Sequence, residues 1–390
     1  IFERYAEIFQ EDHPNVTINP VFSGSYTDTR TTVLTEIQGG GAGPDVAVML
    51  TTDLYSFAEE GYIVPAQQFI DEMEDGEAYV NDFFPALLAN SIDEDGNVWS
   101  IPFQRSTPIM YYNADLLAEA GFDAPPTNSD ELVEMAVALT AEDRDGLQVP
   151  VAGGFPIWMY QSFAIAHGQN IVNDDPTQVL FNTPEGVAAV ELLTSLGTDL
   201  GVGPVGGSAW GDTPTAFLAG QAAMIYHTTG NLTRILNDAE FEVGVWYLPS
   251  GPAGEDGTGY GSPTGGGNLY IFADDSRSEA ETQAIWDWVT FLSSPEIQAD
   301  WGATTGYIAA SATAWETEPL ASLAAEFPQY LIARDQLQFA QKEFTSYGAI
   351  TIQNIINSTL ESILIGEAED AQAALEEAQA QIDSILAEYQ

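Results

Sequence analysis

The sequence "IPFQRSTPIMYYNADLLAEAGFDAPPTNSDEL" runs from Ile101 to Leu132 and changes character several times within a short distance. An apolar strand that includes Ile101–Phe103 is followed by a polar loop over Gln104–Thr107 and then by the aromatic run Tyr111–Asn113. A helix-like segment, a double proline and a new helix start complete it. Hydroxyl groups and an arginine at the end of a strand indicate either an ordinary loop or a place where the protein contacts a small molecule.

Upstream of this stretch, short apolar strands alternate with helical segments. Strands are predicted over Val16–Phe22 and over "GPDVAVML", Gly43–Leu50, with a helix over Asp28–Gln38 between them. Two further helices are predicted over Phe57–Phe69 and Val80–Ala89. This alternation is typical of an α/β fold with a largely parallel sheet.

The N-terminal segment reads as an amphipathic helix with Ile1, Tyr5, Ile8 and Phe9 on one side. A helix that leads into the strand Val16–Phe22 normally follows another strand in a βαβ unit. We therefore expect an N-terminal strand, and any export signal, to precede Ile1 in the natural protein.

Downstream, the chain becomes rich in helices and then returns to strands. One predicted helix opens at Ser129, and the others and the strands between them are Pro184–Leu196, Pro214–Ala219, "AAMIYH" (222–227) and "EVGVWYLP" (242–249). Ser250–Gly267 holds eight glycines and two prolines and is predicted to be a loop. The strand "NLYIFA" follows it.

Two C-terminal segments have strong helical periodicity. The first carries the apolar stripe Ile285, Trp288, Val289 and Leu292. The second, Glu369–Tyr389, carries the buried stripe Leu375, Ile382 and Leu386. The pattern changes near residue 108 and strands return near residue 262. We therefore expect two discontinuous lobes, an N-terminal lobe of residues 1–108 plus 262–308 and a C-terminal lobe of residues 109–261 plus 309–390.

The charge balance is extreme, with 59 acidic residues against 8 basic ones and a formal net charge of −51. Such a surface repels nucleic acids and anionic lipids, so neither is an expected partner. The acids are scattered among apolar residues, which indicates the acidic surface of a folded protein, and Lys342 is the one lysine. This composition favours a halophilic or marine source, where salt screens repulsion between acids; the alternative is an ordinary acidic secreted protein.

Motifs for catalysis or metal binding are not recognisable. The sequence has no cysteine, and its three histidines are far apart and form no HExxH or HxH motif. "DEDG" (93–96) and "DRDG" (143–146) lack the ligands of calcium loops at the outer positions and read as turns. We expect no metal and no cofactor.

Two glycine-containing stretches also fail as motifs. "GTGYGS" (257–262) is no dinucleotide fingerprint, and "GGSAWG" (206–211) lacks the glycine that ends a nucleophile elbow. With 59 carboxylates, however, a secreted glycosidase that uses a carboxylate pair remains the alternative to a protein without catalysis.

The stretch Ile101–Leu132 resembles the first crossing between lobes in the extracellular solute-binding proteins of ABC importers, the family that includes maltose-binding proteins. The likeness is strongest to the glycerol-3-phosphate-binding branch, in which PF, STP, YYN, AG and PP follow one another in the same way. Seven more fragments occur in the family's order: "GPDVAVML", "AAMIYHTTGNLTRI", "EFEVGVWYLP", "GGGNLYIF", "FLSSPEIQADW", "TTGYIAAS" and "TLESILIGEAEDAQAALEEA".

This resemblance implies a two-lobed periplasmic-binding-protein fold of class II, clam-like and hinged, that is no enzyme. A small sugar, polyol glycoside or glycerol-phosphate-type solute would bind in a cleft between the lobes, and the closed form would be presented to the permease subunits of the transporter. The protein would act as a monomer in the periplasm or another extracytoplasmic space, anchored to the cell surface in an archaeal or Gram-positive source.

The resemblance also implies a set of ligand-binding residues. Their hydroxyls and backbone N–H groups would bind polar atoms of the solute, and their aromatic rings would cover its C–H surface. Five of them, Tyr26, Ser106, Thr228, Gly266 and Tyr307, are expected to converge on one cleft. The full set is Tyr26, Thr51, Asp53, Arg105, Ser106, Phe155, Trp158, Thr228, Gly266, Gly267 and Tyr307.

Two departures from the branch affect the expected solute. Thr51 stands where the branch has an acid, which leaves Asp53 as the nearest carboxylate, and Thr345 stands near the position of an arginine that would bind a phosphate. Arg105 either compensates for that arginine or forms a surface ion pair. A neutral sugar, a glycoside of glycerol or a glycerophosphodiester is therefore at least as good a candidate as glycerol 3-phosphate.

Overall fold

The computed structural model describes residues 1–152 and 156–390. The chain forms two compact units, each assembled from three separate pieces of sequence. Unit 1 contains Ile1–Arg105, Gly266–Gly302 and Ala309–Ala321, and unit 2 contains Ser106–Gly265, Ala303–Ile308 and Ser322–Gln390.

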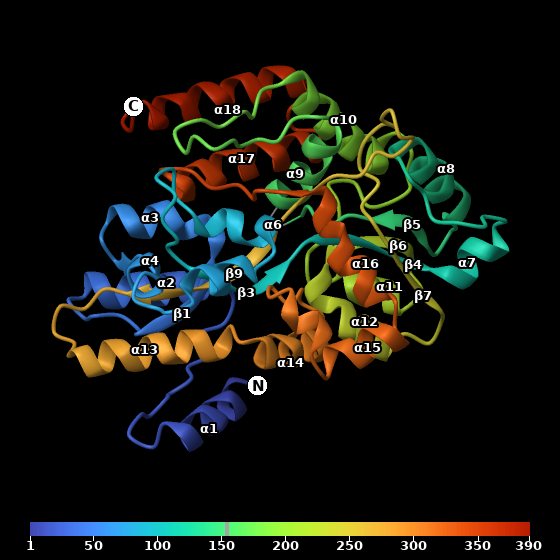
Figure 1. Ribbon diagram of the computed structural model, residues 1–390. Coiled ribbons are helices and arrows are strands. Elements are labelled where there is room, and N and C mark those ends of the chain that lie inside the picture. The colour runs from blue at the N-terminus through green and yellow to red at the C-terminus, as the bar shows by residue number, and fades with distance from the viewer. Residues whose placement is uncertain (153–155) are drawn as a thin grey trace. The chain divides into compact units, whose positions relative to one another are not determined.

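Unit 1 is built on a sheet whose centre is β9 (Gly265–Phe272). β9 is antiparallel to β1 (Val46–Leu50) and to β2 (Ile63–Val64), and β3 (Ile101–Ser106) also pairs with it (Figure 1). The register places Leu50 opposite Gly267, so the end of β1 lies beside the glycine-rich start of β9. The pairing thereby brings three polar segments, residues 51–53, 104–106 and 265–267, together at one edge of the sheet.

The helices of unit 1 pack around this sheet. The core includes Val33, Phe57, Tyr270 and Phe272, all buried. The helices are α1 (Phe2–Asp12), α2 (Tyr26–Gln38), α3 (Leu54–Glu59), α4 (Gln67–Ile70), α5 (Gly76–Asn81), α6 (Pro85–Leu88), α13 (Glu279–Leu292) and α14 (Pro295–Thr305), which ends in unit 2.

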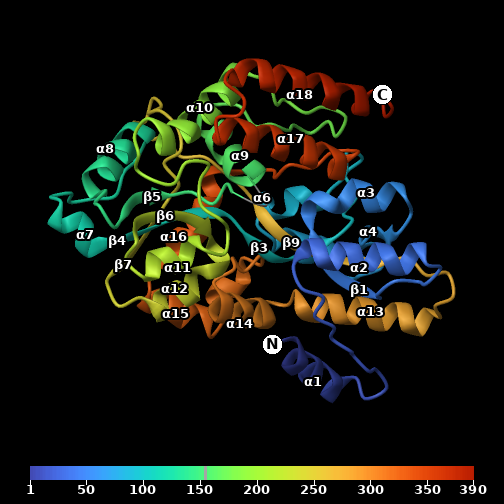
Figure 2. The same ribbon diagram turned by 180° about the vertical axis from the view of Figure 1, so that it is seen from behind.

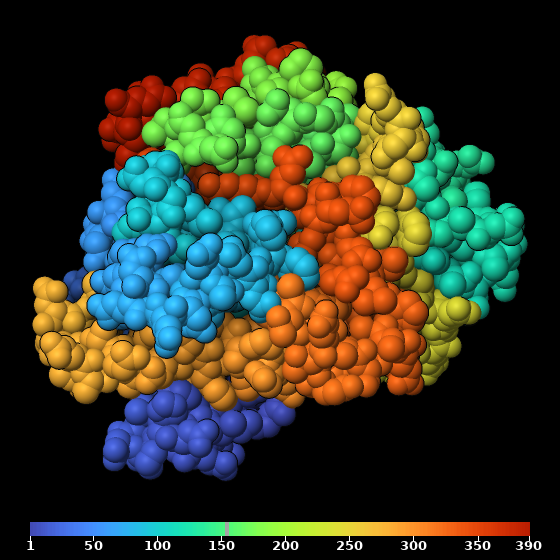
Figure 3. Space-filling model, viewed as in Figure 1, coloured from blue at the N-terminus to red at the C-terminus, as the bar shows by residue number. Residues whose placement is uncertain are grey.

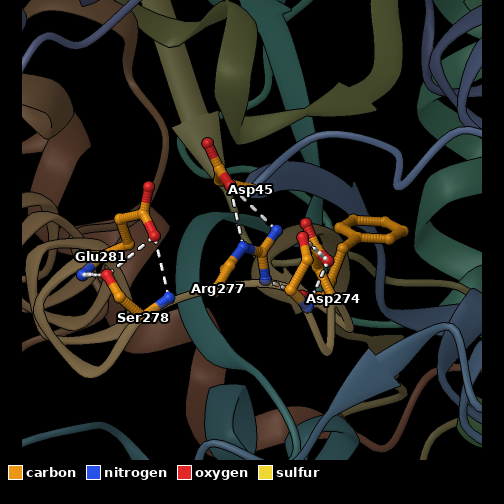
Figure 4. A network of polar contacts seen from close by, with 7 residues as sticks. Asp45, Asp274, Arg277, Ser278 and Glu281 are labelled. Atoms are coloured by element: carbon orange, nitrogen blue, oxygen red, sulfur yellow. Dashed lines mark hydrogen bonds and ion pairs between the residues drawn. The ribbon is translucent and has the colours of Figure 1, made fainter.

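A network of polar contacts fixes the start of α13 against the sheet (Figure 4). Arg277 donates from Nε to Asp45 Oδ1 over 3.0 Å and also donates to the carbonyl of Phe272 at the end of β9. The next residue, Ser278, forms a capping box with Glu281. This explains why a helix begins there, with the predicted stripe Ile285, Trp288, Val289 and Leu292 buried beneath it.

Unit 2 is built on a second sheet of strand order β5-β6-β4-β7. β5 (Asp145–Gln148) is parallel to β6 (Ala222–Thr228), and β4 (Pro108–Asn113) is antiparallel to both β6 and β7 (Val243–Trp246). Pro108 lies opposite Thr228, so the start of β4 meets the end of β6. A separate short ribbon joins β8 (Ser262–Pro263) to β10 (Ala340–Gln341) in parallel.

The helices α9, α10, α17 and α18 of unit 2 pack on one another (Figure 2). The space-filling view shows the surfaces of α10 and α18, green and red, meeting directly (Figure 3). The helices of the unit are α7 (Ala114–Glu119), α8 (Ser129–Leu139), α9 (Pro156–Ala166), α10 (Pro184–Thr198), α11 (Thr213–Leu218), α12 (Leu232–Asp238), α15 (Leu320–Glu326), α16 (Gln329–Asp335), α17 (Ala349–Leu364) and α18 (Ala371–Leu386).

Several predicted elements near the N-terminus are wrong. Val16–Phe22 is no strand in the structure, and Val21 and Phe22 are 76% and 92% exposed. Its β-branched and aromatic residues favour a strand, but a strand also requires backbone partners, and none pairs with it among the described residues. The predicted helix Phe57–Phe69 contains β2, and Ile8 on the predicted buried side of α1 is exposed.

The polar segments near the two crossings between units are also more regular than predicted. Gln104, Arg105 and Ser106 continue β3 instead of forming a loop, and β9 begins already at Gly265. Backbone pairing between the two strands accounts for both differences, because it orders residues whose local sequence favours a turn.

No helix among the described residues is long and apolar enough to cross a membrane.

Candidate functional site

In unit 1, the start of β9 lies against the end of β3. Gly266 has φ +92°, and a Cβ at this position would lie 2.1 Å from the carbonyl oxygen of Gln104. Any other residue would therefore be strained and would clash with the backbone. Gly266 is also partly exposed, so its peptide group lies at the surface of the unit.

Tyr26 lies at the same edge of the sheet. It is the first residue of α2, which begins at the capping box of Ser25 and Asp28, and its hydroxyl accepts a hydrogen bond from the side-chain amide of Gln104. A Cβ on Gly267 would lie 2.9 Å from the Tyr26 ring, so the ring packs directly on the glycine backbone. The ring of Tyr26 is thereby held in one place while it remains partly exposed.

Thr51 and Asp53 follow the end of β1 in a short 3-10 helix, Thr51–Asp53. Both are buried, and Asp53 Oδ1 accepts a hydrogen bond from Arg30 Nη1 over 2.9 Å. The second oxygen of Asp53 has no hydrogen-bond partner within the described part of the chain. Burial raises the pKa of the Asp53 carboxyl, and the Arg30 guanidinium opposes that rise.

Arg105 is completely buried and forms part of this edge. Its Nη1 donates to the carbonyl of Gly266 over 3.2 Å. The alternative of a surface ion pair for Arg105 is therefore wrong, because the side chain has no surface exposure. The guanidinium instead binds the backbone carbonyl of Gly266.

In unit 2, Thr228 ends β6 and pairs with Pro108, which follows Ser106 and Thr107 in the chain. The Thr228 hydroxyl accepts a hydrogen bond from Gly230 N over 3.1 Å, and its carbonyl accepts one from the Tyr111 hydroxyl. A Cβ on Gly230 would lie 2.7 Å from the Tyr307 ring, so this ring packs on the turn that follows Thr228. Ser106 precedes Thr107, whose carbonyl accepts from Thr229 N.

Trp158, from α9, lies on the backbone that precedes β9. Its indole Nε1 donates to the Thr264 carbonyl over 2.8 Å, and a Cβ on Gly265 would lie 2.6 Å from the ring. The Trp158 side chain is almost fully buried. The neighbouring candidate Phe155 lies outside the described residues.

The structure thus assembles the predicted residues into two sets, one within each unit. The unit-1 set is Tyr26, Thr51, Asp53, Arg105, Gly266 and Gly267, and the unit-2 set is Ser106, Trp158, Thr228 and Tyr307. The convergence of both sets on one cleft stays a prediction. Among the described residues, no group of histidines, cysteines and acids could hold a metal ion.

Sequence reasoning missed three residues of these surroundings: Gln104, Trp210 and His227. Gln104 contacts Tyr26 from β3, and Trp210 contacts both Trp158 and His227. For Gln104 the signal was present in the polar stretch after Phe103. No local pattern distinguished Trp210 or His227, because each acquires its neighbours only through the fold.

The sequence profile of the bacterial extracellular solute-binding proteins matches residues 4–329. The chain belongs to this family. Relatives include sn-glycerol-3-phosphate-binding periplasmic proteins UgpB. The protein from Yersinia enterocolitica is 28% identical over 322 residues, which cover 80% of this chain and 71% of the relative. The one from Pectobacterium atrosepticum is 25% identical over 384 residues, covering 94% and 84%.

Solved structures of similar fold extend over almost the entire chain. UgpB from Mycobacterium tuberculosis in complex with glycerophosphocholine has a TM-score of 0.84 at 23% identity and covers 99% of this chain and 95% of that one. Maltose-bound MalE3 of T. maritima has a TM-score of 0.81 at 21% identity, covering 98% and 95%. The predicted two-lobed periplasmic-binding-protein fold is confirmed.

The predicted function is confirmed at the level of the family. The protein is an extracytoplasmic solute-binding protein of the kind that serves ABC importers of sugars and glycerol phosphates. Members of this family bind solutes and are not enzymes.

Proposed function

We propose that this protein captures a small hydroxylated solute that carries no net negative charge, and that it delivers the solute to the permease of an ABC importer. The solute class is a sugar, a polyol glycoside or a glycerophosphodiester with a cationic headgroup. The observation that carries this proposal is that the basic side chains at the unit-1 set are already engaged by the protein itself.

The engaged bases are Arg30 and Arg105. Arg30 is paired with buried Asp53, and Arg105 donates to the carbonyl of Gly266. A phosphate dianion would have to compete for these groups, and it would also meet the field of a chain with a formal charge of −51. A hydroxyl-rich solute needs only the hydroxyls of Tyr26, Ser106 and Thr228 and the backbone at Gly266.

The aromatic residues supply the second requirement. Tyr26, Trp158 and Tyr307 each have a ring fixed against a glycine backbone, at Gly267, Gly265 and Gly230 respectively. Such rings cover the C–H faces of sugars and polyols, and they attract the quaternary ammonium group of a choline headgroup. A ligand of this class therefore uses both the polar and the aromatic members of the two sets.

Isothermal titration calorimetry of the protein with maltose, glycerol, glycerol 3-phosphate and glycerophosphocholine tests the proposal. We expect saturable binding of maltose or glycerophosphocholine and weaker or no binding of glycerol 3-phosphate. Tightest binding to glycerol 3-phosphate would overturn the assigned charge class. Binding to none of the four would overturn the proposed function.

We further propose that the protein binds its solute without converting it. Asp53 is the one carboxylate of the two sets, and it is paired with Arg30, whereas a glycosidase needs two carboxyl groups on either side of the scissile bond. Chromatographic analysis of maltose after prolonged incubation with stoichiometric protein checks this. Release of glucose would favour a glycosidase.

We also propose that the protein is a monomer that acts outside the cytoplasm. Its large negative charge should repel nucleic acid, so we expect no nucleic-acid partner. Sedimentation of the purified chain should give one species near the 42.0 kDa expected from its sequence. A concentration-dependent dimer would contradict the monomer.

We also propose that the acidic surface is an adaptation to high salt. Repulsion among 59 acids opposed by 8 bases should weaken folding in dilute buffer, and salt should relieve it. We expect the urea midpoint of unfolding to rise between low and molar potassium chloride. An unchanged midpoint would remove the argument for a halophilic source.

A further inference from the structure

Unit 2 holds an aromatic residue that the resemblance does not assign to ligand binding. Trp210 lies in the "GGSAWG" segment (206–211) and is partly exposed. Its ring centroid lies 5.7 Å from that of Trp158 and 4.2 Å from that of His227, with the planes tilted by 54° and 41°. Trp210 therefore lies between a predicted ligand contact and the residue that precedes Thr228.

The segment that carries Trp210 is tightly fixed in unit 2. Ser208 N donates to the Val149 carbonyl, and Ala152 N donates to the Ser208 carbonyl, each over 3.0 Å. A Cβ on Gly207, which has φ +77°, would lie 2.2 Å from the Val151 side chain, so only glycine allows the segment to approach so closely. Trp210 is thus presented from a rigid loop.

His227 contacts both the Trp210 backbone and the side chain of Asn231. Its Nε2 lies 3.0 Å from the carbonyl oxygen of Trp210, and its Nδ1 lies 2.9 Å from the side-chain amide nitrogen of Asn231. These partners define one neutral tautomer, in which Nε2–H donates to Trp210 and Nδ1 accepts from Asn231. Burial lowers the pKa of His227 to about 4, which keeps the imidazole neutral over the ordinary pH range.

We propose that Trp210 is a further solute-contacting residue whose ring binds the C–H face or quaternary ammonium group of the solute, and that His227 is its positioning residue. This inference rests on the proposed function. Its physical basis is that a tryptophan face gains most from a ligand when it is partly exposed and already fixed in place. Trp158 provides the adjoining buried ring against which the Trp210 indole packs.

The choice of Trp210 over other partly exposed rings depends on its neighbours. Trp99 is also partly buried, but its indole donates to Asp93 Oδ2 over 2.7 Å in a turn of unit 1 and none of the predicted contacts adjoins it in the described hydrogen bonds and ring contacts. Trp210 contacts Trp158 directly and connects through His227 to Thr228. Trp99 is therefore a matched control.

The experiment compares wild type with Trp210→Ala, Trp210→Phe and the control Trp99→Phe, using calorimetry and tryptophan fluorescence with maltose and glycerophosphocholine as probes. We expect Trp210→Ala to weaken binding roughly tenfold or more, and Trp210→Phe to restore a large part of the affinity because it keeps an aromatic face. The change in fluorescence on binding should shrink in Trp210→Phe and persist in Trp99→Phe.

The role of His227 is tested by two variants that separate its functions. His227→Gln can still donate to the Trp210 carbonyl, whereas His227→Phe keeps a ring and loses the donor. We expect His227→Gln to bind several-fold more tightly than His227→Phe, by the loss of one buried hydrogen bond. Equal affinity of both variants would overturn the positioning role.

The outcomes also distinguish the two levels of the proposal. If wild type binds neither probe, the proposed function is overturned. If wild type binds a probe and Trp210→Ala binds it equally well, the proposed function stands and the assignment of Trp210 is wrong. If Trp99→Phe loses as much affinity as Trp210→Phe, the loss does not depend on contact between Trp210 and the solute, and the assignment is also wrong.

Discussion

The two sets of candidate residues are held in place by different physics. In unit 1, charged groups are buried and paired: Arg30 with Asp53, and Arg105 with the carbonyl of Gly266. In unit 2, the arrangement depends on a neutral histidine and on tryptophan rings, as seen for Trp158 and His227.

This difference separates the role of charge from that of apolar surface in the proposed binding of a solute without net negative charge. The charges of the unit-1 set neutralise one another or bind backbone, so they fix geometry and are not left to attract an ion. The unit-2 set offers apolar faces whose interaction with a solute depends little on ionic strength. Variants that disturb charge should therefore act on folding, and variants of the aromatic set should act on binding.

The largest effect is expected from Arg30→Met, which leaves the buried carboxylate of Asp53 without its partner. Removing one member of a buried pair should lower the free energy of unfolding by about 3 kcal/mol or more. The control is Arg234→Met, since Arg234 and Asp238 are both more than half exposed and that pair should contribute little. Urea denaturation of both variants gives the comparison, and equal losses would contradict it.

The pH dependence of Arg30→Met sharpens the same prediction. Burial already raises the folded pKa of Asp53 above its ordinary value, and loss of Arg30 should raise it further. A raised carboxyl pKa means that the folded state binds the proton more tightly, so the loss of stability should grow as pH rises and diminish toward acid. A loss that is independent of pH between 4 and 7 would show that removal of Arg30 does not raise the pKa of Asp53.

The second effect concerns His227, the neutral residue that precedes Thr228 of the unit-2 set. Its folded pKa is lowered from 6.5 to about 4, so the unfolded state binds the proton more readily between these values. The contribution of His227 to stability should be fully present above pH 6.5 and should decrease as pH falls toward 4, by at most about 3 kcal/mol. The measurement is the difference in unfolding free energy between wild type and His227→Gln at several pH values, which cancels the carboxylates they share. A constant difference would contradict the pKa shift.

The third effect is expected from Gly266→Ala. The positive φ and the 2.1 Å approach to the Gln104 carbonyl should cost roughly 2 kcal/mol of stability and should displace the backbone beside Tyr26. Gly254→Ala is the control, because Gly254 is exposed and its nearest contact lies at 3.3 Å. If both variants unfold at the same urea concentration, an alanine at position 266 is not strained, and the prediction is wrong.

The smallest effects are expected from the single hydroxyls that are proposed to contact the solute. Ser106→Ala and Thr228→Ala should each weaken binding of maltose or glycerophosphocholine several-fold, about 1 kcal/mol per lost hydrogen bond. Thr228→Ser keeps the hydroxyl that accepts from Gly230 N and should bind more tightly than Thr228→Ala. Calorimetry with one solute across these variants tests the unit-2 set, since unchanged affinity in both alanine variants would show that these hydroxyls do not contact the solute.

Much of the fold could be predicted from local sequence where one face of an element is apolar. The stripe from Ile285 to Leu292 and the buried side of α18, with Leu375, Ile382 and Leu386, lie as predicted. Prediction failed where pairing or its lack decides the outcome: Val16–Phe22 has the composition of a strand and is none, and Gln104–Ser106 has the composition of a loop and is a strand.

What the sequence determined by itself is the family, the two-unit α/β fold, the acidic character and the types of residue that could bind a solute, because these follow from composition, order and periodicity. The tertiary structure decided the rest. It buried Arg105 against Gly266, paired Arg30 with Asp53, and brought Trp210 of a glycine-rich loop between Trp158 and His227. Such contacts join residues up to 161 positions apart, as between Arg105 and Gly266, and no local pattern encodes them because burial and partners are properties of the packed chain.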